Sequence, residues 1–191
     1  MSIVVAVKKG TDVALAADTQ SSFGAGMVPA DNHRASKIRK VGPVYVATTG
    51  WGIYDNILEE VFGGRRAPRL ENSRDIFAFF LGLWRRLHER YPFVKDQCHK
   101  HDDSPFGDLD ASFLVVNGRG IFYVASDMSV TRFDRYYAVG SGADLGMGAI
   151  HALYNRLDNV EEIARSAVEA AIALNTTCGG EIEARKLKAR A

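Results

Sequence analysis

The second residue of the chain is the first whose type and place could carry chemistry. A small residue such as Ser2 normally permits removal of the initiator methionine, which would leave a hydroxyl and a free α-amine on one residue. An α-amine has a pKa of about 7.7–8.0, so a useful fraction is neutral near pH 7 and can accept a proton. Nucleophile and base would then sit on the same residue. Most proteins with serine here simply lose Met1 and do no chemistry, so Ser2 needs further support.

A predicted hairpin brings a carboxylate to Ser2. Apolar runs at residues 3–7 and 13–17 flank a turn-like stretch at residues 8–12, which is typical of two antiparallel strands covered on both faces. With the turn centred on Gly10, the start of the first strand pairs with the end of the second, and Asp18 falls opposite Ser2 at a Cβ separation of about 5 Å. A shift of one residue in this register would exchange the two faces.

A second group of reactive side chains lies in a polar loop at residues 95–110. Its members are of types that bind metals: Cys98, His99, His101, Asp102 and Asp103. Their spacing matches no common metal site. We therefore expect a solvated loop, no bound metal and no cofactor.

The composition indicates one globular domain with a sizeable core. The chain has 191 residues, of which 47% are hydrophobic and 25% charged, and its formal net charge is +1, which favours neither a nucleic acid nor an anionic membrane as partner. Its two cysteines are too few for a disulfide framework. The run at residues 3–7 has no signal-peptide features, and no window has the roughly 18 uninterrupted apolar residues of a membrane span. We expect a cytoplasmic protein.

The order of predicted elements indicates an α+β fold. After the first hairpin and a long loop at residues 19–34, strands are expected at 36–41 and 44–48 and helices at 53–61 and 73–91. Strands follow at 113–116 and 121–125, with a strand region at 132–139. Helices are then expected from Ser141 to near Arg156, where Ser141 could be the N-cap, and at 160–174, with a short basic tail from Glu181. Segregated runs of strands and helices suggest two sheets packed face to face with helices outside each.

Five segments in sequence order resemble the proteasome β-type subunit family of N-terminal-nucleophile hydrolases, above all its bacterial HslV branch and the betaproteobacterial proteasome homologue. They are the strand that begins at Ser2, the strand that ends at Asp18, Ala35-Ser36-Lys37-Ile38, Ala47-Thr48-Thr49-Gly50 and Val139-Gly140-Ser141-Gly142. The resemblance covers most of the chain, from residue 2 to about residue 180, and is consistent with residues 1–191 forming one domain.

This resemblance implies a four-layer αββα sandwich, assembled as a homo-oligomer into stacked rings that enclose the active sites. It implies peptide-bond hydrolysis through an acyl-enzyme on Ser2, with peptides or unfolded proteins as substrates and an ATPase unfoldase as a partner to be considered. Lys37 would favour the deprotonated hydroxyl, Asp18 would orient Lys37, and the Gly50 amide would bind the oxyanion. Ser141 would hold the α-amine.

Other residues near this expected site have less defined roles. Thr49 and Trp51 would flank the cleft and shape substrate preference, although Trp51 is equally explained as a core residue. Lys40 is the alternative to Lys37, because the segment between Asp18 and Lys37 is longer than is usual in the family. Cys178 and Asn175 stand where many relatives have a serine near the α-amine and an aspartate.

Ordinary structural explanations exist for the same residues. Lys37 could be a solvated lysine, Asp18 a turn residue and Gly50 a strand-to-helix glycine. The chain as a whole also has two alternative functions: an inactive proteasome-like subunit that retains Met1, or a monomeric amidase of the wider N-terminal-nucleophile class.

The usual family nucleophile is threonine, which is stiff at χ1 because it is β-branched. We therefore expect the serine enzyme to be slower and still active.

Overall fold

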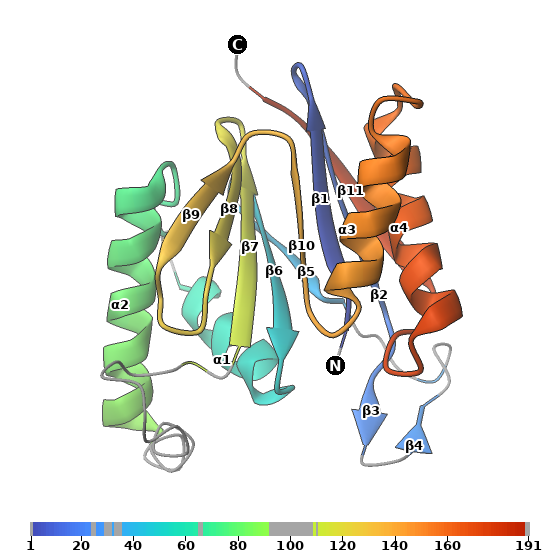
Figure 1. Ribbon diagram of the computed structural model, residues 1–191. Coiled ribbons are helices and arrows are strands. Elements are labelled where there is room, and N and C mark those ends of the chain that lie inside the picture. Colours follow the sequence, from blue (N-terminus) through green and yellow to red (C-terminus); the bar gives the residue numbers. More distant parts are fainter. Residues whose placement is uncertain are drawn as a thin grey trace.

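The computed structural model describes residues 2–23, 26–28, 32, 36–64, 67–91, 109 and 111–189. The elements form four layers, with two antiparallel sheets stacked face to face and a pair of helices covering the outer face of each (Figure 1). This αββα arrangement confirms the predicted α+β sandwich. The layers bury three hydrophobic clusters, one between the sheets and one beneath each helical pair.

The first sheet is built around the N-terminal hairpin. Its strands are β1 (Val4–Lys9), β2 (Asp12–Asp18), β10 (Tyr136–Val139) and β11 (Ile182–Lys188), in the order β10-β1-β2-β11. Gly10 has a φ of 56°, which only glycine adopts readily and which suits a tight two-residue turn. The hairpin at the centre of this sheet therefore fixes where the residues that flank its open end lie.

The second sheet has five strands in sequential order. They are β5 (Ile38–Val41), β6 (Val44–Gly50), β7 (Ala111–Asn117), β8 (Gly120–Val124) and β9 (Val130–Phe133). Each is joined to its neighbour in an antiparallel register, as in the pair of Thr48 with Phe113. The predicted hairpin at residues 117–120 is confirmed.

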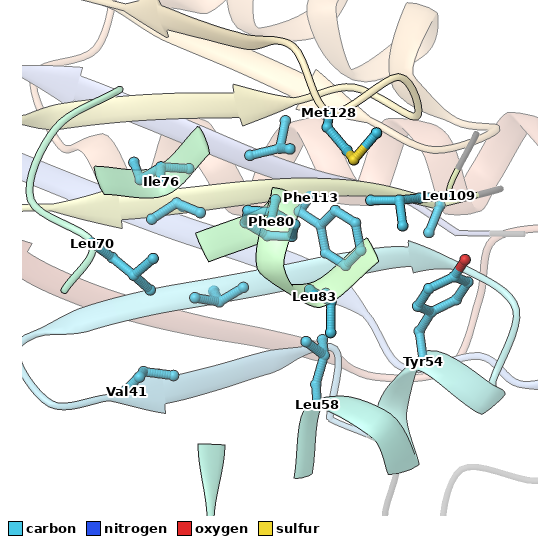
Figure 2. Close-up of a cluster of buried hydrophobic side chains, with 14 of the residues drawn as sticks. Val41, Tyr54, Leu58, Leu70, Ile76, Phe80, Leu83, Leu109, Phe113 and Met128 are labelled. Atoms are coloured by element: carbon cyan, nitrogen blue, oxygen red, sulfur yellow. The ribbon is translucent and has the colours of Figure 1, made fainter. Parts of the chain in front are cut away.

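Two helices cover each sheet. Helices α1 (Ile53–Phe62) and α2 (Ser73–Arg90) pack on the five-stranded sheet, and α3 (Ala143–Leu153) and α4 (Val160–Leu174) pack on the four-stranded sheet (Figure 1). Figure 2 shows the cluster beneath α1 and α2, where Phe80 from α2 meets Phe113 of β7 and Tyr54 of α1 points towards the same sheet. The ring centroids of Phe80 and Phe113 are 4.7 Å apart.

Strand β1 shows why its sequence is apolar without alternation. Val5 and Val7 pack against α3 and α4, whereas Val4 and Ala6 pack between the sheets. Both faces of the strand are therefore buried, which is why a continuous apolar run is needed.

The hairpin register differs by one residue from the prediction. Val4 pairs with Ala17 and Lys9 with Asp12, so the residue opposite Asp18 is Ile3, whose carbonyl accepts from the Asp18 N–H at 3.3 Å. The cause is the turn, which contains two residues and is not centred on Gly10 alone. Placement of Asp18 directly opposite Ser2 was therefore wrong.

Four further expectations are corrected. The loop at residues 19–34 contains short strands β3 (Ser22–Phe23) and β4 (Gly26–Met27), and the basic tail forms strand β11 by pairing with β2. The region at 132–139 is two strands in different sheets. Asn72, not Ser73, caps α2, because its side chain accepts from the Asp75 N–H at 3.0 Å.

The described residues contain no helix long and apolar enough to cross a membrane. Within those same ranges, no group of three or more His, Cys, Asp or Glu side chains is placed to hold a metal ion. The residues from Cys98 to Asp103, which were expected to lie in a solvated loop without a metal, are outside the described residues.

Candidate active site

Ser2 lies two residues before Val4, the first residue of β1, and is held by the segment that joins β10 to α3. Only 4% of the surface of Ser2 is exposed to solvent. The Ser2 N–H donates to Ser141 Oγ at 3.1 Å, and the Ser2 carbonyl accepts from the Gly142 N–H at 3.2 Å. A Cβ on Gly140 would lie 2.2 Å from the Ser2 carbonyl oxygen, so only glycine permits this approach. The Gly-Ser-Gly segment therefore fixes the backbone of Ser2.

Asp18 lies at the end of β2 and is fully buried. Its Oδ1 accepts from the Ile3 N–H at 2.9 Å and from Lys37 Nζ at 2.6 Å, and its Oδ2 accepts from the Gly179 N–H at 3.1 Å. Three donors compensate the loss of hydration of this carboxylate. One oxygen of Asp18 thus joins the lysine to the amide that directly follows Ser2, despite the shifted register.

Lys37 comes just before β5, and its carbonyl accepts from the Thr48 N–H at 3.1 Å. Its side chain is 11% exposed. Burial lowers the pKa of Lys37, and the charge of Asp18 opposes that shift in part. The alternative lysine, Lys40, is exposed on β5. The lysine that the structure brings to Asp18 is therefore Lys37.

Ser141 belongs to a chain of hydrogen bonds that reaches Asn175. Ser141 Oγ lies 2.6 Å from Thr177 Oγ1, which donates to Asn175 Oδ1 at 2.7 Å. Asn175 Nδ2 in turn donates to the Ser141 carbonyl at 2.8 Å. Ser141 does not cap α3, because the N-cap position is Gly142 and has no side-chain cap bond. The predicted capping role was wrong, whereas Asn175 and Ser141 are brought together.

Cys178 packs against the same segment. It is buried, and a Cβ on Gly142 would lie 2.8 Å from its Sγ. Burial raises the pKa of the Cys178 thiol, and the nearby Asp18 carboxylate adds to the shift. The thiol is therefore neutral near pH 7, which argues against a thiolate nucleophile.

The end of β6 contributes Thr49 and Gly50. Gly50 has a φ of 132°, a conformation that favours glycine, and pairs with Ala111 of β7. Thr49 is 6% exposed, and its Cγ2 would lie 3.1 Å from a Cβ on Gly140. Trp51 is 59% exposed, so its explanation as a core residue was wrong.

Two participants were missed in the sequence. Gln20 is buried, and its Nε2 donates to Ser22 Oγ at 3.2 Å and to the Thr176 carbonyl at 3.4 Å, which ties the segment after β2 to the one after α4. Thr177 was given no role from the sequence. The sequence signal was Asn175 two residues before it, since asparagine side chains often bond to the backbone two residues on; the Thr177 N–H donates to Asn175 Oδ1 at 2.9 Å.

Together these elements form a compact polar site at one end of the sandwich. It holds a hydroxyl-bearing residue at the start of a strand, a buried ammonium beside a buried carboxylate, and a hydroxyl that accepts from the nitrogen of Ser2. Such a set can stabilise a developing alkoxide and hold an amine in place as a base.

Comparison with known proteins decides the family. The chain is 31% identical over 177 residues to an ATP-dependent protease subunit HslV from Caldicellulosiruptor saccharolyticus, with 90% of this chain and 89% of the relative covered. The chain belongs to the HslV-like, proteasome β-type family of N-terminal-nucleophile hydrolases. A second HslV, from a Thermoanaerobacter species, is 26% identical over 180 residues and covers 88% of each chain.

Solved members of the HslV-like family have the same architecture. BPH from Thiobacillus denitrificans, in complex with epoxomicin, is 31% identical, has a TM-score of 0.89 and covers 99% of this chain and 100% of its own. HslV from Trypanosoma brucei is 18% identical, with a TM-score of 0.68 over 97% of this chain and 99% of its own, and supports the fold alone. No protein-family model matches the chain. The suspected HslV-like family is thereby confirmed.

Proposed function

We propose that this chain is a peptidase subunit that uses Ser2 as an N-terminal nucleophile after Met1 has been removed. The observation that carries the proposal is Asp18 Oδ1, which accepts both from Lys37 Nζ and from the amide that follows Ser2. This shared oxygen ties a buried ammonium to the residue whose hydroxyl must lose a proton. Membership of the HslV-like family supports the same assignment.

The reaction begins when the free α-amine of Ser2 takes the proton of its own Oγ. That oxygen attacks a peptide carbonyl carbon, and the displaced electron pair moves to the carbonyl oxygen. The Gly50 N–H binds this oxyanion, a type of contact that contributes about 3 kcal/mol in measured cases. Collapse of the intermediate breaks the C–N bond, and the ammonium returns its proton to the leaving amine. Water then cleaves the ester, with the amine again acting as base.

Lys37 and Asp18 make the attack easier without exchanging the proton themselves. The ammonium stabilises negative charge that develops on Ser2 Oγ, because Lys37 Nζ and the amide after Ser2 bind the same Asp18 oxygen in a buried site. Asp18 holds the ammonium in place through the 2.6 Å contact. Gly140 lies between Ser2 and Thr49, because a Cβ on Gly140 would approach both of these residues. From this position Thr49 can contact the substrate.

A homo-oligomer of stacked rings is the assembly we propose. The curated relatives are named as subunits of an ATP-dependent protease, which supports a multisubunit enzyme and an ATPase unfoldase as its partner. Enclosure of the sites in rings would restrict a weakly selective peptidase to unfolded chains and peptides, and a cytoplasmic location fits such a role. Sedimentation would give a mass many times 20.9 kDa.

An epoxyketone adduct tests the nucleophile. Epoxomicin is present in the BPH complex, and a peptide epoxyketone forms its ring adduct only with a hydroxyl and a free amine on one residue. After incubation, peptide mass mapping should locate the adduct on Ser2. The matched control is Ser2→Ala, which keeps a small second residue so that Met1 can still be removed, but which has no hydroxyl.

Two results would overturn the proposal in different ways. An intact mass that retains Met1 in the assembled protein would indicate the inactive subunit, because the amine stays in a peptide bond. A monomeric mass together with adduct formation would indicate the small amidase, because one chain cannot enclose a chamber.

A further inference from the structure

The hydrogen-bond chain behind Ser141 has a direction, and that direction bears on how Ser2 would work. We propose that Thr177 is a positioning residue that makes Ser141 a hydrogen-bond acceptor towards the Ser2 nitrogen. This inference rests on the function proposed above, since it concerns the α-amine that must act as base.

The orientation of the Asn175 amide is fixed at both of its ends. Its Nδ2 lies 2.8 Å from the Ser141 carbonyl oxygen, and its Oδ1 lies 2.9 Å from the Thr177 nitrogen. A flipped amide would set oxygen against oxygen and two N–H groups against each other, so this orientation is the one that satisfies both contacts. Asn175 Oδ1 is therefore an acceptor at this site.

The position of the Thr177 proton follows. Thr177 Oγ1 lies 2.7 Å from Asn175 Oδ1, and that oxygen can only accept, so the single hydroxyl proton of Thr177 points to Asn175. Thr177 Oγ1 must then accept in its 2.6 Å contact with Ser141 Oγ. The Ser141 hydroxyl is the donor in that pair.

Two other acceptors lie near the Ser141 proton. One is Cys178 Sγ, which hydrogen bonds link to the Ser141 and Thr177 side chains, but sulfur is only a weak acceptor. The other is the Ser2 carbonyl oxygen, which lies 3.4 Å from Ser141 Oγ and already accepts from the Gly142 N–H. An O–H···O bond of 2.6 Å is near the optimum, whereas 3.4 Å lies well beyond it. Thr177 therefore takes the Ser141 proton, and Ser141 Oγ presents its lone pairs to the Ser2 N–H at 3.1 Å.

This direction matters once the Ser2 nitrogen is a free amine. If Ser141 donated to the amine, it would occupy the lone pair that must take the Oγ proton. As an acceptor, Ser141 holds an amine N–H and leaves that lone pair available. The same chain polarises Ser141 Oγ, which favours the ammonium form and so raises the basicity of the amine.

The test compares Thr177→Val, which keeps the shape and loses the hydroxyl, with Thr177→Ser, which keeps the hydroxyl. The readout is kcat/KM for a fluorogenic peptide as a function of pH. Thr177→Val should lower the plateau of kcat/KM about tenfold, the effect of losing about one hydrogen bond, and move the acidic limb to lower pH. Thr177→Ser should keep both the plateau of kcat/KM and the pH of the acidic limb. Thr176→Val is the matched control, because Thr176 is the exposed neighbouring threonine.

A double variant separates positioning from packing. If Thr177 acts through Ser141, then Ser141→Ala alone and Ser141→Ala with Thr177→Val should have the same kcat/KM. The inference would be overturned if the double variant lost kcat/KM by the product of the two single losses. It would also be overturned if the pH profile of Thr177→Val equalled that of the unaltered chain. If Thr177→Val fails to fold, Thr177→Ala replaces it with the same expected outcomes. An unaltered chain that forms no epoxyketone adduct on Ser2 would instead refute the proposed function, and this inference with it.

Discussion

Lys37 Nζ lies 2.6 Å from Asp18 Oδ1, although Asp18 ends β2 of one sheet and Lys37 precedes β5 of the other. Asp18 is inaccessible to solvent and Lys37 nearly so. A buried ion pair gives little net stability, because the cost of removing both charges from water offsets their attraction. In the proposed mechanism the role of this pair is to hold a positive charge near Ser2, and five variants and a pH profile can test that role.

The first prediction concerns the nucleophile itself. Ser2→Ala should abolish peptide hydrolysis, because it removes the attacking oxygen and leaves the backbone contacts of residue 2 in place. Ser2→Thr should raise turnover several-fold, because the β-branched side chain restricts χ1 and preorganises the hydroxyl. Both are measured as kcat for one peptide substrate. A lower kcat in Ser2→Thr would contradict the idea that the serine enzyme is limited by preorganisation.

The second prediction concerns the stability of the Asp18 site. Asp18→Ala removes the acceptor for three buried donors and should lower the free energy of unfolding by about 3–5 kcal/mol. Lys37→Met should cost less, because the Asp18 carboxylate keeps the N–H donors of Ile3 and Gly179. Urea denaturation gives both values.

A surface pair provides the control for that comparison. Lys9 and Asp158 form an ion pair in which the Asp158 side chain is fully exposed, so Asp158→Ala should change stability by less than about 1 kcal/mol. If Asp158→Ala and Asp18→Ala lowered the free energy of unfolding equally, burial of the Asp18 site would not contribute to stability.

The third prediction is a bell-shaped dependence of kcat/KM on pH. Activity should rise as the α-amine loses its proton. An ordinary α-amine does so at a pKa of about 7.7–8.0, and the contact with Ser141 should move this limb to higher pH. It should fall again as Lys37 loses its charge. Because burial lowers the pKa of Lys37, this second limb should appear at lower pH than an ordinary lysine would give. Lys37→Arg should keep reduced activity and lose the alkaline limb, since arginine stays charged. An alkaline limb that persists in Lys37→Arg would assign it to another group.

The fourth prediction tests the close approach at Gly140. Its Cβ would lie 2.2 Å from the Ser2 carbonyl oxygen, and its φ is 99°. Gly140→Ala should therefore displace Ser2, lower the melting temperature by several degrees and abolish adduct formation. Gly148 lies exposed in α3, where a Cβ would meet nothing within 4 Å. Gly148→Ala should stabilise the protein by up to about 1 kcal/mol. Normal adduct formation in Gly140→Ala would refute the fit around Ser2.

Local patterns in the sequence were enough to predict much of this architecture. The helices at 53–62 and 73–90 and the hairpin at 117–120 follow from apolar periodicity and turn residues, which act over a few residues. The register of the first hairpin was missed by one, because a turn of two residues and a turn centred on Gly10 have similar compositions. The tail after Glu181 looked like a charged end, yet it pairs with β2 as an edge strand whose outer face is exposed.

The amino-acid sequence alone predicted an N-terminal hairpin of two buried strands, the place of Asp18 at the end of the second strand, and the resemblance to the family. Tertiary structure alone decided that Lys37 and not Lys40 meets Asp18, and that Ser141, Thr177 and Asn175 form one chain behind the Ser2 nitrogen. The physical reason is distance along the chain. Ser141 is separated from Ser2 by 139 residues, so their contact depends on the packing of β10, α3 and α4 and on no local preference of either segment.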